Sequence, residues 1–115
     1  MPHTNYQLSG EEMERFRRQG YLGPYVLCSP DEMRGMQPAI ERVLETDAPD
    51  HGVREHNRHL DCPLIHELAT HPAVVKRMAA LYAPDLLLWR TNFFVKEPGA
   101  KEIPWHQDFL SFARR

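Results

Sequence analysis

The feature that most constrains the fold of this chain is a change of hydrophobic period near Asp85. Before it, apolar residues recur every three or four positions, which is the spacing of amphipathic helices. After it, residues 86–95 are almost continuously apolar, a pattern typical of a strand buried on both faces. Pro98 and Gly99 mark a turn, and a second apolar run follows at 103–112. The order predicts helices first and strands only at the end.

Capping signals locate the first two helices. Ser9 can cap a helix that ends at Gly20, because serine accepts early backbone N–H groups and glycine readily takes the left-handed conformation. The Ser-Pro-Asp-Glu run at 29–32 combines a cap, a proline suited to the first turn and a capping-box glutamate. We predict that this second helix runs to about Glu45, with a short strand at 21–27 before it.

The next part of the chain is predicted to be a loop followed by two more helices. Residues 46–60 are polar and predict a long loop. A short helix is plausible over 63–69. Thr70 can cap a further helix that starts at Pro72 and buries its valine, methionine and leucine side chains.

The predicted fold class is α+β, with a helical region at about 8–85 and the first core strands at about 86–112. Two or three strands cannot make an independent sheet with its own core. We therefore expect residues 1–115 to be the N-terminal part of a single, larger β-rich domain.

Composition excludes several classes of function. The formal net charge is −2, so no strong field attracts nucleic acid or an anionic membrane. No apolar run approaches the length of a membrane span, and the polar start of the chain shows no signal peptide. The two cysteines suggest neither a disulfide scaffold nor a zinc site. We expect a cytoplasmic protein whose partner is a small molecule, and the sequence carries no signal for its oligomeric state.

The candidate metal ligands are His106 and Asp108, two positions apart on the predicted strand. Side chains at i and i+2 of a strand point to the same side. They lie about 7 Å apart, since the rise is about 3.3 Å per residue. An imidazole and a carboxylate so placed can converge on one metal ion. They supply two-thirds of the triad of two histidines and one carboxylate that holds non-haem Fe(II).

The same region carries a resemblance to a known family. The run WRTNFFVKEPG at 89–99, followed by IPWHQD at 103–108, resembles the phytanoyl-CoA dioxygenase family. The upstream runs NRHLD at 57–61 and THPAV at 70–74 are also similar. The resemblance extends over residues 8 to 112, and a K-x-P-G turn before W-H-Q-D is far more specific than an isolated His-x-Asp.

The resemblance implies a fold, a reaction and site residues. Family members are Fe(II)- and 2-oxoglutarate-dependent oxygenases on a double-stranded β-helix, or jelly roll. It implies that His106 and Asp108 bind iron and that Asn92 lies near the co-substrate, with Lys96 close by. It implies hydroxylation rather than halogenation, because a halide needs the coordination position that Asp108 takes. The substrate would be a small molecule or an acyl compound, with 2-oxoglutarate converted to succinate and carbon dioxide.

The resemblance also implies residues that this chain does not contain. In the family, the second iron-binding histidine and the basic residue for the far carboxylate of 2-oxoglutarate come well after the position of Arg115. We therefore expect an N-terminal fragment that is inactive alone. The alternative is a non-catalytic truncated homologue, or an interaction module whose unpaired sheet edge docks on a partner. A third possibility is a homologue that binds metal but is inactive.

Two further candidates are weaker. His59 and Asp61 form a second His-x-Asp pair, but they lie in the polar loop, where hydrogen bonding across the loop is favoured over metal binding. Arg54 falls roughly where some relatives carry a basic contact to the co-substrate. Trp105 and Phe109 are expected to pack around the metal site.

Overall fold

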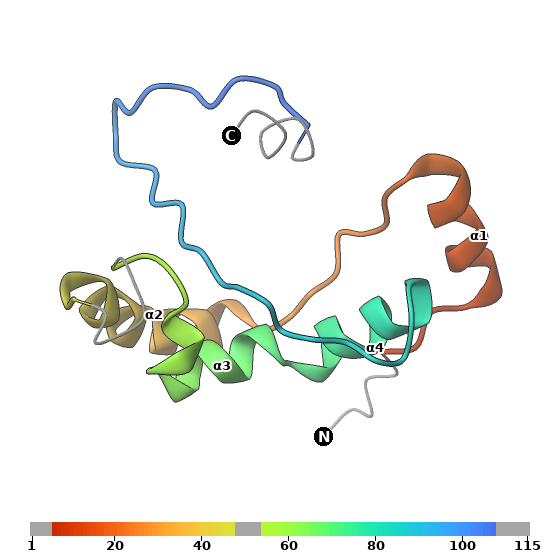
Figure 1. Cartoon of the computed structure of the whole chain (residues 1–115), viewed down its shortest axis with the longest axis horizontal. Coiled ribbons are helices and arrows are strands. Elements are labelled where there is room, and N and C mark those ends of the chain that lie inside the picture. Colours follow the sequence, from red (N-terminus) through yellow and green to blue (C-terminus); the bar gives the residue numbers. More distant parts are fainter. Residues whose placement is uncertain (1–5, 48–53, 108–115) are drawn as a thin grey trace.

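In a computed structural model, residues 6–47 and 54–107 of the chain are described. They form four α-helices and one 3-10 helix: α1 (Gly10–Gln19), α2 (Pro30–Glu45), η1 (Arg58–Leu60), α3 (Pro63–Ala69) and α4 (Pro72–Leu81). Figure 1 shows α2, α3 and α4 following one another in a single layer, with α1 beyond α4. Residues 83–107 form an extended segment, here called the arm, that crosses the helices and then leaves them.

The first two helices begin at capping boxes, which confirms the predicted starts. The Ser9 hydroxyl accepts the Glu12 N–H at 3.2 Å, and the Glu12 carboxylate accepts the Ser9 N–H at 2.9 Å. At the start of α2, the Ser29 hydroxyl accepts the Glu32 N–H at 3.2 Å, and the Glu32 carboxylate accepts the Ser29 N–H at 2.7 Å. Each box satisfies two backbone N–H groups that no helical carbonyl could reach. α1 ends at Gly20, whose φ of 81° is the left-handed conformation expected of a glycine there.

The later helices have the predicted bounds, but the cap of α4 is a different residue. His71 is the cap, because its Nδ1 accepts the Ala73 N–H at 3.1 Å. The Thr70 hydroxyl instead donates to the carbonyl of His66 at 2.7 Å, at the end of α3. The Thr70 cap was therefore a wrong prediction. Threonine can satisfy either a following N–H or a preceding carbonyl, and here the preceding turn provides the partner.

The predicted strands are absent from the part of the chain that the structure describes, so the α+β jelly-roll prediction is wrong there. Residues 21–27 are irregular, and the arm is extended without a strand ladder. Its one pairing is an isolated antiparallel bridge between His56 and Asn92. Asn57 N–H donates to the Thr91 carbonyl at 2.7 Å, and Phe93 N–H donates to the Glu55 carbonyl at 2.9 Å. A strand needs a continuous neighbouring segment, and 54–107 provides one only across this bridge.

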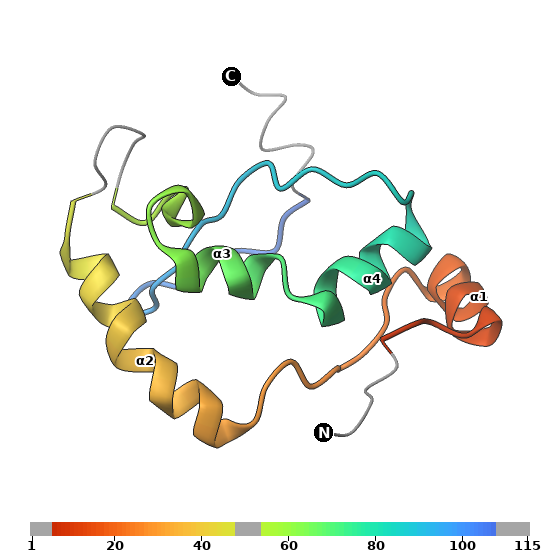
Figure 2. The ribbon, with the colours of Figure 1, turned by 90° about the horizontal axis from the view of Figure 1, so that it is seen from below.

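Few of the described side chains are buried. Ile65 and Ala73 are the buried apolar residues, and Arg58 and His59 the buried polar ones. The predicted buried face of α4 is only partly covered, since Val74 remains 39% exposed. The Cα radius of gyration is 16.6 Å, whereas a compact domain of 100 residues has about 13 Å. The helices form a thin, open layer rather than the wall of a packed core, as Figure 2 shows.

None of the helices in the described ranges is both long and apolar enough to cross a membrane.

Candidate functional site

His106 lies near the end of the arm, with its ring exposed. Its Nδ1 is 2.9 Å from the carbonyl oxygen of Pro104. Because a carbonyl can only accept, Nδ1 must carry the proton in this contact. In a neutral imidazole the lone pair then lies on Nε2, and this tautomer is the usual one for a histidine that binds metal through Nε2.

The predicted iron site falls only partly within the described residues. Asp108 lies outside the described residues, so the separation of the predicted ligand pair is not fixed here. Within 6–47 and 54–107, no group of three His, Cys, Asp or Glu side chains is arranged to hold a metal ion. The chemistry of His106 suits one iron ligand, but the described residues do not complete a site around it. Iron ligation by His106 and Asp108 therefore stays a prediction.

Asn92 occupies the bridge between the arm and the segment before η1. Its backbone faces His56 across the bridge, and its side chain is half-buried. The amide oxygen Oδ1 is buried and has no hydrogen-bond donor among the described atoms. Such an acceptor is available to a donor group from a ligand or a water molecule. It gives no support for contact with 2-oxoglutarate, whose carboxylate and keto oxygens are all acceptors. The position of Asn92 near the co-substrate stays a prediction.

The other predicted basic residues are turned to local partners. The Lys96 ammonium donates to the carbonyl of Lys101, across the turn that contains Gly99, where φ is 77°. Arg54 is half-exposed and pairs with Asp47 at 3.2 Å. Trp105 is fully exposed, so it does not pack around His106 as expected; Phe109 lies outside the described residues.

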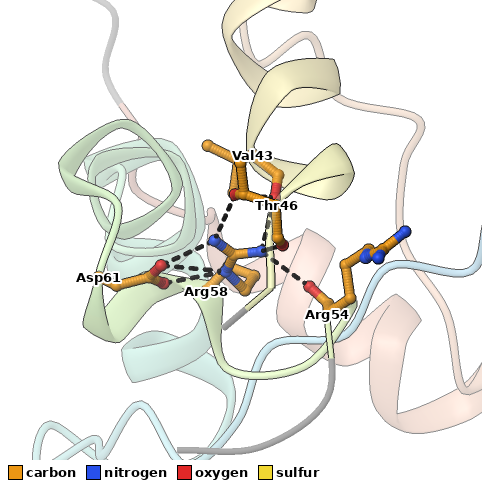
Figure 3. A network of polar contacts seen from close by, with 5 residues as sticks. All are labelled: Val43, Thr46, Arg54, Arg58 and Asp61. Carbon is orange, nitrogen blue, oxygen red and sulfur yellow. Dashed lines mark hydrogen bonds and ion pairs between the residues drawn. The ribbon is translucent and has the colours of Figure 1, made fainter. Parts of the chain in front are cut away.

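A polar cluster in the described chain centres on Arg58, which the sequence analysis did not single out. Arg58 is 2% exposed. Figure 3 shows its guanidinium surrounded by the end of α2, the following loop and Asp61. Nη1 donates to the carbonyls of Val43, Thr46 and Arg54 at 2.6, 2.9 and 3.0 Å. Nη2 donates to the Asp61 carboxylate at 2.7 Å, and Nε to the same group at 3.0 Å.

The cluster explains why an arginine can be buried at this point. The carboxylate of Asp61 raises the pKa of Arg58 through its hydrogen bonds, so the guanidinium stays charged. That charge lies at the C-terminal end of α2, where unpaired carbonyls and the helix dipole favour a cation. Arg58 thereby fixes the end of α2 to η1. The sequence signal was an arginine and an aspartate three residues apart after a helix end, which is too common to be diagnostic.

The second His-x-Asp pair is divided between two partners. His59 is buried, and its Nδ1 lies 2.8 Å from the Thr91 hydroxyl oxygen at the start of the arm. Asp61 instead binds Arg58. Both residues form hydrogen bonds, as expected, but the partner of His59 lies on the arm rather than across the loop. Together with the bridge at Asn92, these contacts attach the first part of the arm to the helical layer.

Comparison with known proteins identifies the family. The sequence model of the phytanoyl-CoA dioxygenase (PhyH) family matches residues 16–115. No curated protein and no solved structure gives a significant match. The matched range covers most of the helical layer, the arm and the His-x-Asp motif, which confirms the resemblance read from the sequence. Membership suggests a domain of the oxygenase type, in a family that generally depends on Fe(II) and 2-oxoglutarate. The chain belongs to the phytanoyl-CoA dioxygenase family.

Proposed function

We propose that this protein acts as a non-haem Fe(II)- and 2-oxoglutarate-dependent dioxygenase of the hydroxylase type, with a small molecule or an acyl compound as substrate. The single observation that carries the proposal is the family match over residues 16–115, which includes the His-x-Asp motif. The hydrogen bond from His106 Nδ1 to Pro104 is compatible with it, because it directs the lone pair of a neutral ring to Nε2.

Each proposed residue has a distinct task. His106 provides one neutral nitrogen ligand and Asp108 one carboxylate ligand, the latter occupying the position that a halogenase leaves for halide. Asn92 would donate to the co-substrate through its amide N–H groups, because 2-oxoglutarate carries acceptor oxygens alone. Iron, when bound with 2-oxoglutarate and oxygen, supplies the oxidising power for C–H hydroxylation. The protein residues contribute binding and orientation.

The test is the substitution His106→Ala in the polypeptide as its gene encodes it. Anaerobic Fe(II) titration with 2-oxoglutarate should give a weak visible charge-transfer band in the wild type, and the variant should lose both this band and succinate formation. His66→Ala is the matched control, because His66 is an exposed histidine on α3. Undiminished succinate production by the His106 variant would overturn the proposal.

A second candidate is a non-catalytic homologue whose arm docks on a protein partner. The exposure of Leu87, Trp89 and Phe94, at 82%, 81% and 79%, favours this reading. Extended backbone with unsatisfied hydrogen-bonding groups pairs readily with another strand. The same titration separates the two: no charge-transfer band with the polypeptide as encoded would favour the docking module.

A further inference from the structure

An apolar cavity lies on the side of the helical layer where α1 and α4 meet. It has a volume of about 370 Å³ and is bounded by α1, residues 22–27 and α4. Its apolar walls include Phe16, Leu22, Leu27, Val74, Met78 and Leu81. Among the side chains that line it, Arg77 is the charged one. Pockets of this size, mostly apolar with one or two polar groups, are typical of small-molecule sites.

Arg77 is held in place by two aromatic rings. Its guanidinium carbon lies 4.0 Å from the centroid of Tyr25 and 5.5 Å from that of Tyr6. The Tyr25 hydroxyl donates to the Glu12 carboxylate at 2.9 Å, which anchors this ring to α1. Nη1 of Arg77 donates to the Ala73 carbonyl at 2.7 Å. The guanidinium is therefore oriented before any ligand arrives, which lowers the cost of binding.

The hydrogen bonding of Arg77 is nevertheless incomplete. Its Nε–H is buried and has no acceptor among the described atoms, and no described carboxylate forms an ion pair with it. Arg58 differs from Arg77 in this respect, because all three of its nitrogens donate to protein oxygens. A buried donor without an acceptor is costly. Nε itself is closed to solvent, so a ligand oxygen would meet the part of the guanidinium that lines the cavity. A cationic group favours an anionic oxygen.

We propose that this cavity binds a small monocarboxylate with an apolar body, its carboxylate on Arg77 and its body against α1 and α4. One cation among apolar walls matches one negative charge. A dicarboxylate such as 2-oxoglutarate would place its second charge against apolar side chains without a partner, which is unfavourable. The site uses α1, α4 and residues 22–27 rather than the arm, so it does not rest on the proposed dioxygenase function.

The test is isothermal titration calorimetry with octanoate, and with octan-1-ol as the uncharged probe. Wild type should bind octanoate more tightly than octanol. Arg77→Met keeps apolar volume and removes the charge; it should weaken octanoate about tenfold, the effect of losing a charged hydrogen bond, and abolish the preference over octanol. Lys76→Met removes a neighbouring exposed cation of α4 and should change neither affinity.

A second variant separates ligand binding from folding. Val74→Phe should fill the cavity while leaving Arg77 and its two tyrosines in place, and should abolish octanoate binding with the helical circular dichroism unchanged. Failure of wild type to bind octanoate would overturn the proposal. So would an affinity for octanoate in Arg77→Met or Val74→Phe that equals that of the wild type. Loss of iron binding in His106→Ala would leave these results unaffected, so the two proposals fail separately.

Discussion

Arg58 shows at the residue scale how one buried charge can hold three segments together. Arg58→Ala would remove the donor of the Val43 and Thr46 carbonyls and one partner of the Asp61 carboxylate. We expect the free energy of unfolding to fall by about 1–3 kcal/mol, because carbonyls at the end of α2 lose a charged donor while the Asp61 carboxylate can reach solvent. Urea denaturation followed by circular dichroism measures this loss.

Two companion variants give this prediction its controls. Arg58→Lys should recover only part of the stability, because an ammonium cannot form the planar, forked set of bonds that the guanidinium makes. Arg54→Ala removes an exposed pair with Asp47 and should cost at most about 1 kcal/mol. Equal losses for Arg58→Ala and Arg54→Ala would show that the Arg58 cluster does not stabilise the fold.

The residues of the candidate site were only partly predictable. His106 and Asp108 stand out because a His-x-Asp pair beside a specific turn has a chemical meaning at fixed spacing. Arg58 could not be found this way, since its partners at Val43, Thr46 and Arg54 are backbone carbonyls, which any residue provides. A contact to a backbone carbonyl does not require a particular residue type, so the sequence gives no sign of it.

At the scale of single elements, the two capping glutamates predict a dependence of stability on pH. The hydrogen bond from the Ser9 N–H lowers the pKa of Glu12 below its usual 4.5, and the Ser29 N–H does the same for Glu32. A lowered folded-state pKa contributes stability above pH 4.5, and this contribution is lost as pH falls through the folded value. Urea midpoints measured from pH 7 to pH 2 should therefore decline.

The double variant Glu12→Gln/Glu32→Gln is the control for that decline. Glutamine can keep the capping-box hydrogen bond but does not titrate. Its midpoint should lie below that of the wild type at pH 7 and approach it at low pH. A decline equally steep in this variant would assign the effect to other carboxylates.

The start of α4 gives a second prediction for an element. His71→Ala should destabilise the protein by about 1 kcal/mol, because it removes the side-chain acceptor of the Ala73 N–H. His71→Asn should restore most of this, since asparagine is a good cap. Thr70→Val should lower the thermal unfolding temperature less than His71→Ala does. The reverse order would show that Thr70, not His71, is the cap.

Helix bounds were predictable because their causes are local. Serine caps, a proline in the first turn and a terminal glycine act on neighbouring backbone groups, so they read directly from sequence. The strands were not predictable in this way, because apolar runs describe what a strand would bury but not whether a second segment lies beside it. Between 54 and 107, that neighbour exists only at the His56–Asn92 bridge.

At the scale of the whole molecule, much apolar surface remains open to solvent. The accessible surface is 9920 Å², whereas a compact protein of 13.5 kDa exposes about 6,500 Å². The arm accounts for part of this surface. Among the described residues, the backbone–backbone hydrogen bond found within 94–107 is the turn bond from Ala100 N–H to the Glu97 carbonyl. The arm and the helical layer should therefore differ in local stability.

Hydrogen exchange followed by mass spectrometry tests that difference. Amides of residues 94–97, 101–103 and 105–107 should exchange close to the unfolded rate. Those in the middle of α2 and the bridging amides of Asn57 and Phe93 should exchange more slowly. Slow exchange throughout the arm would mean that its backbone is paired, and the picture of an open arm would be wrong.

The adjacent residues Arg58 and His59 bond in two directions, one to the end of α2 and the other to Thr91 at the root of the arm. The two neighbouring side chains thus connect the arm to the end of α2. Displacing the arm at Thr91 would break the contact of His59 and, through its neighbour Arg58, disturb the end of α2. A partner that bound and moved the arm would thereby influence the end of α2.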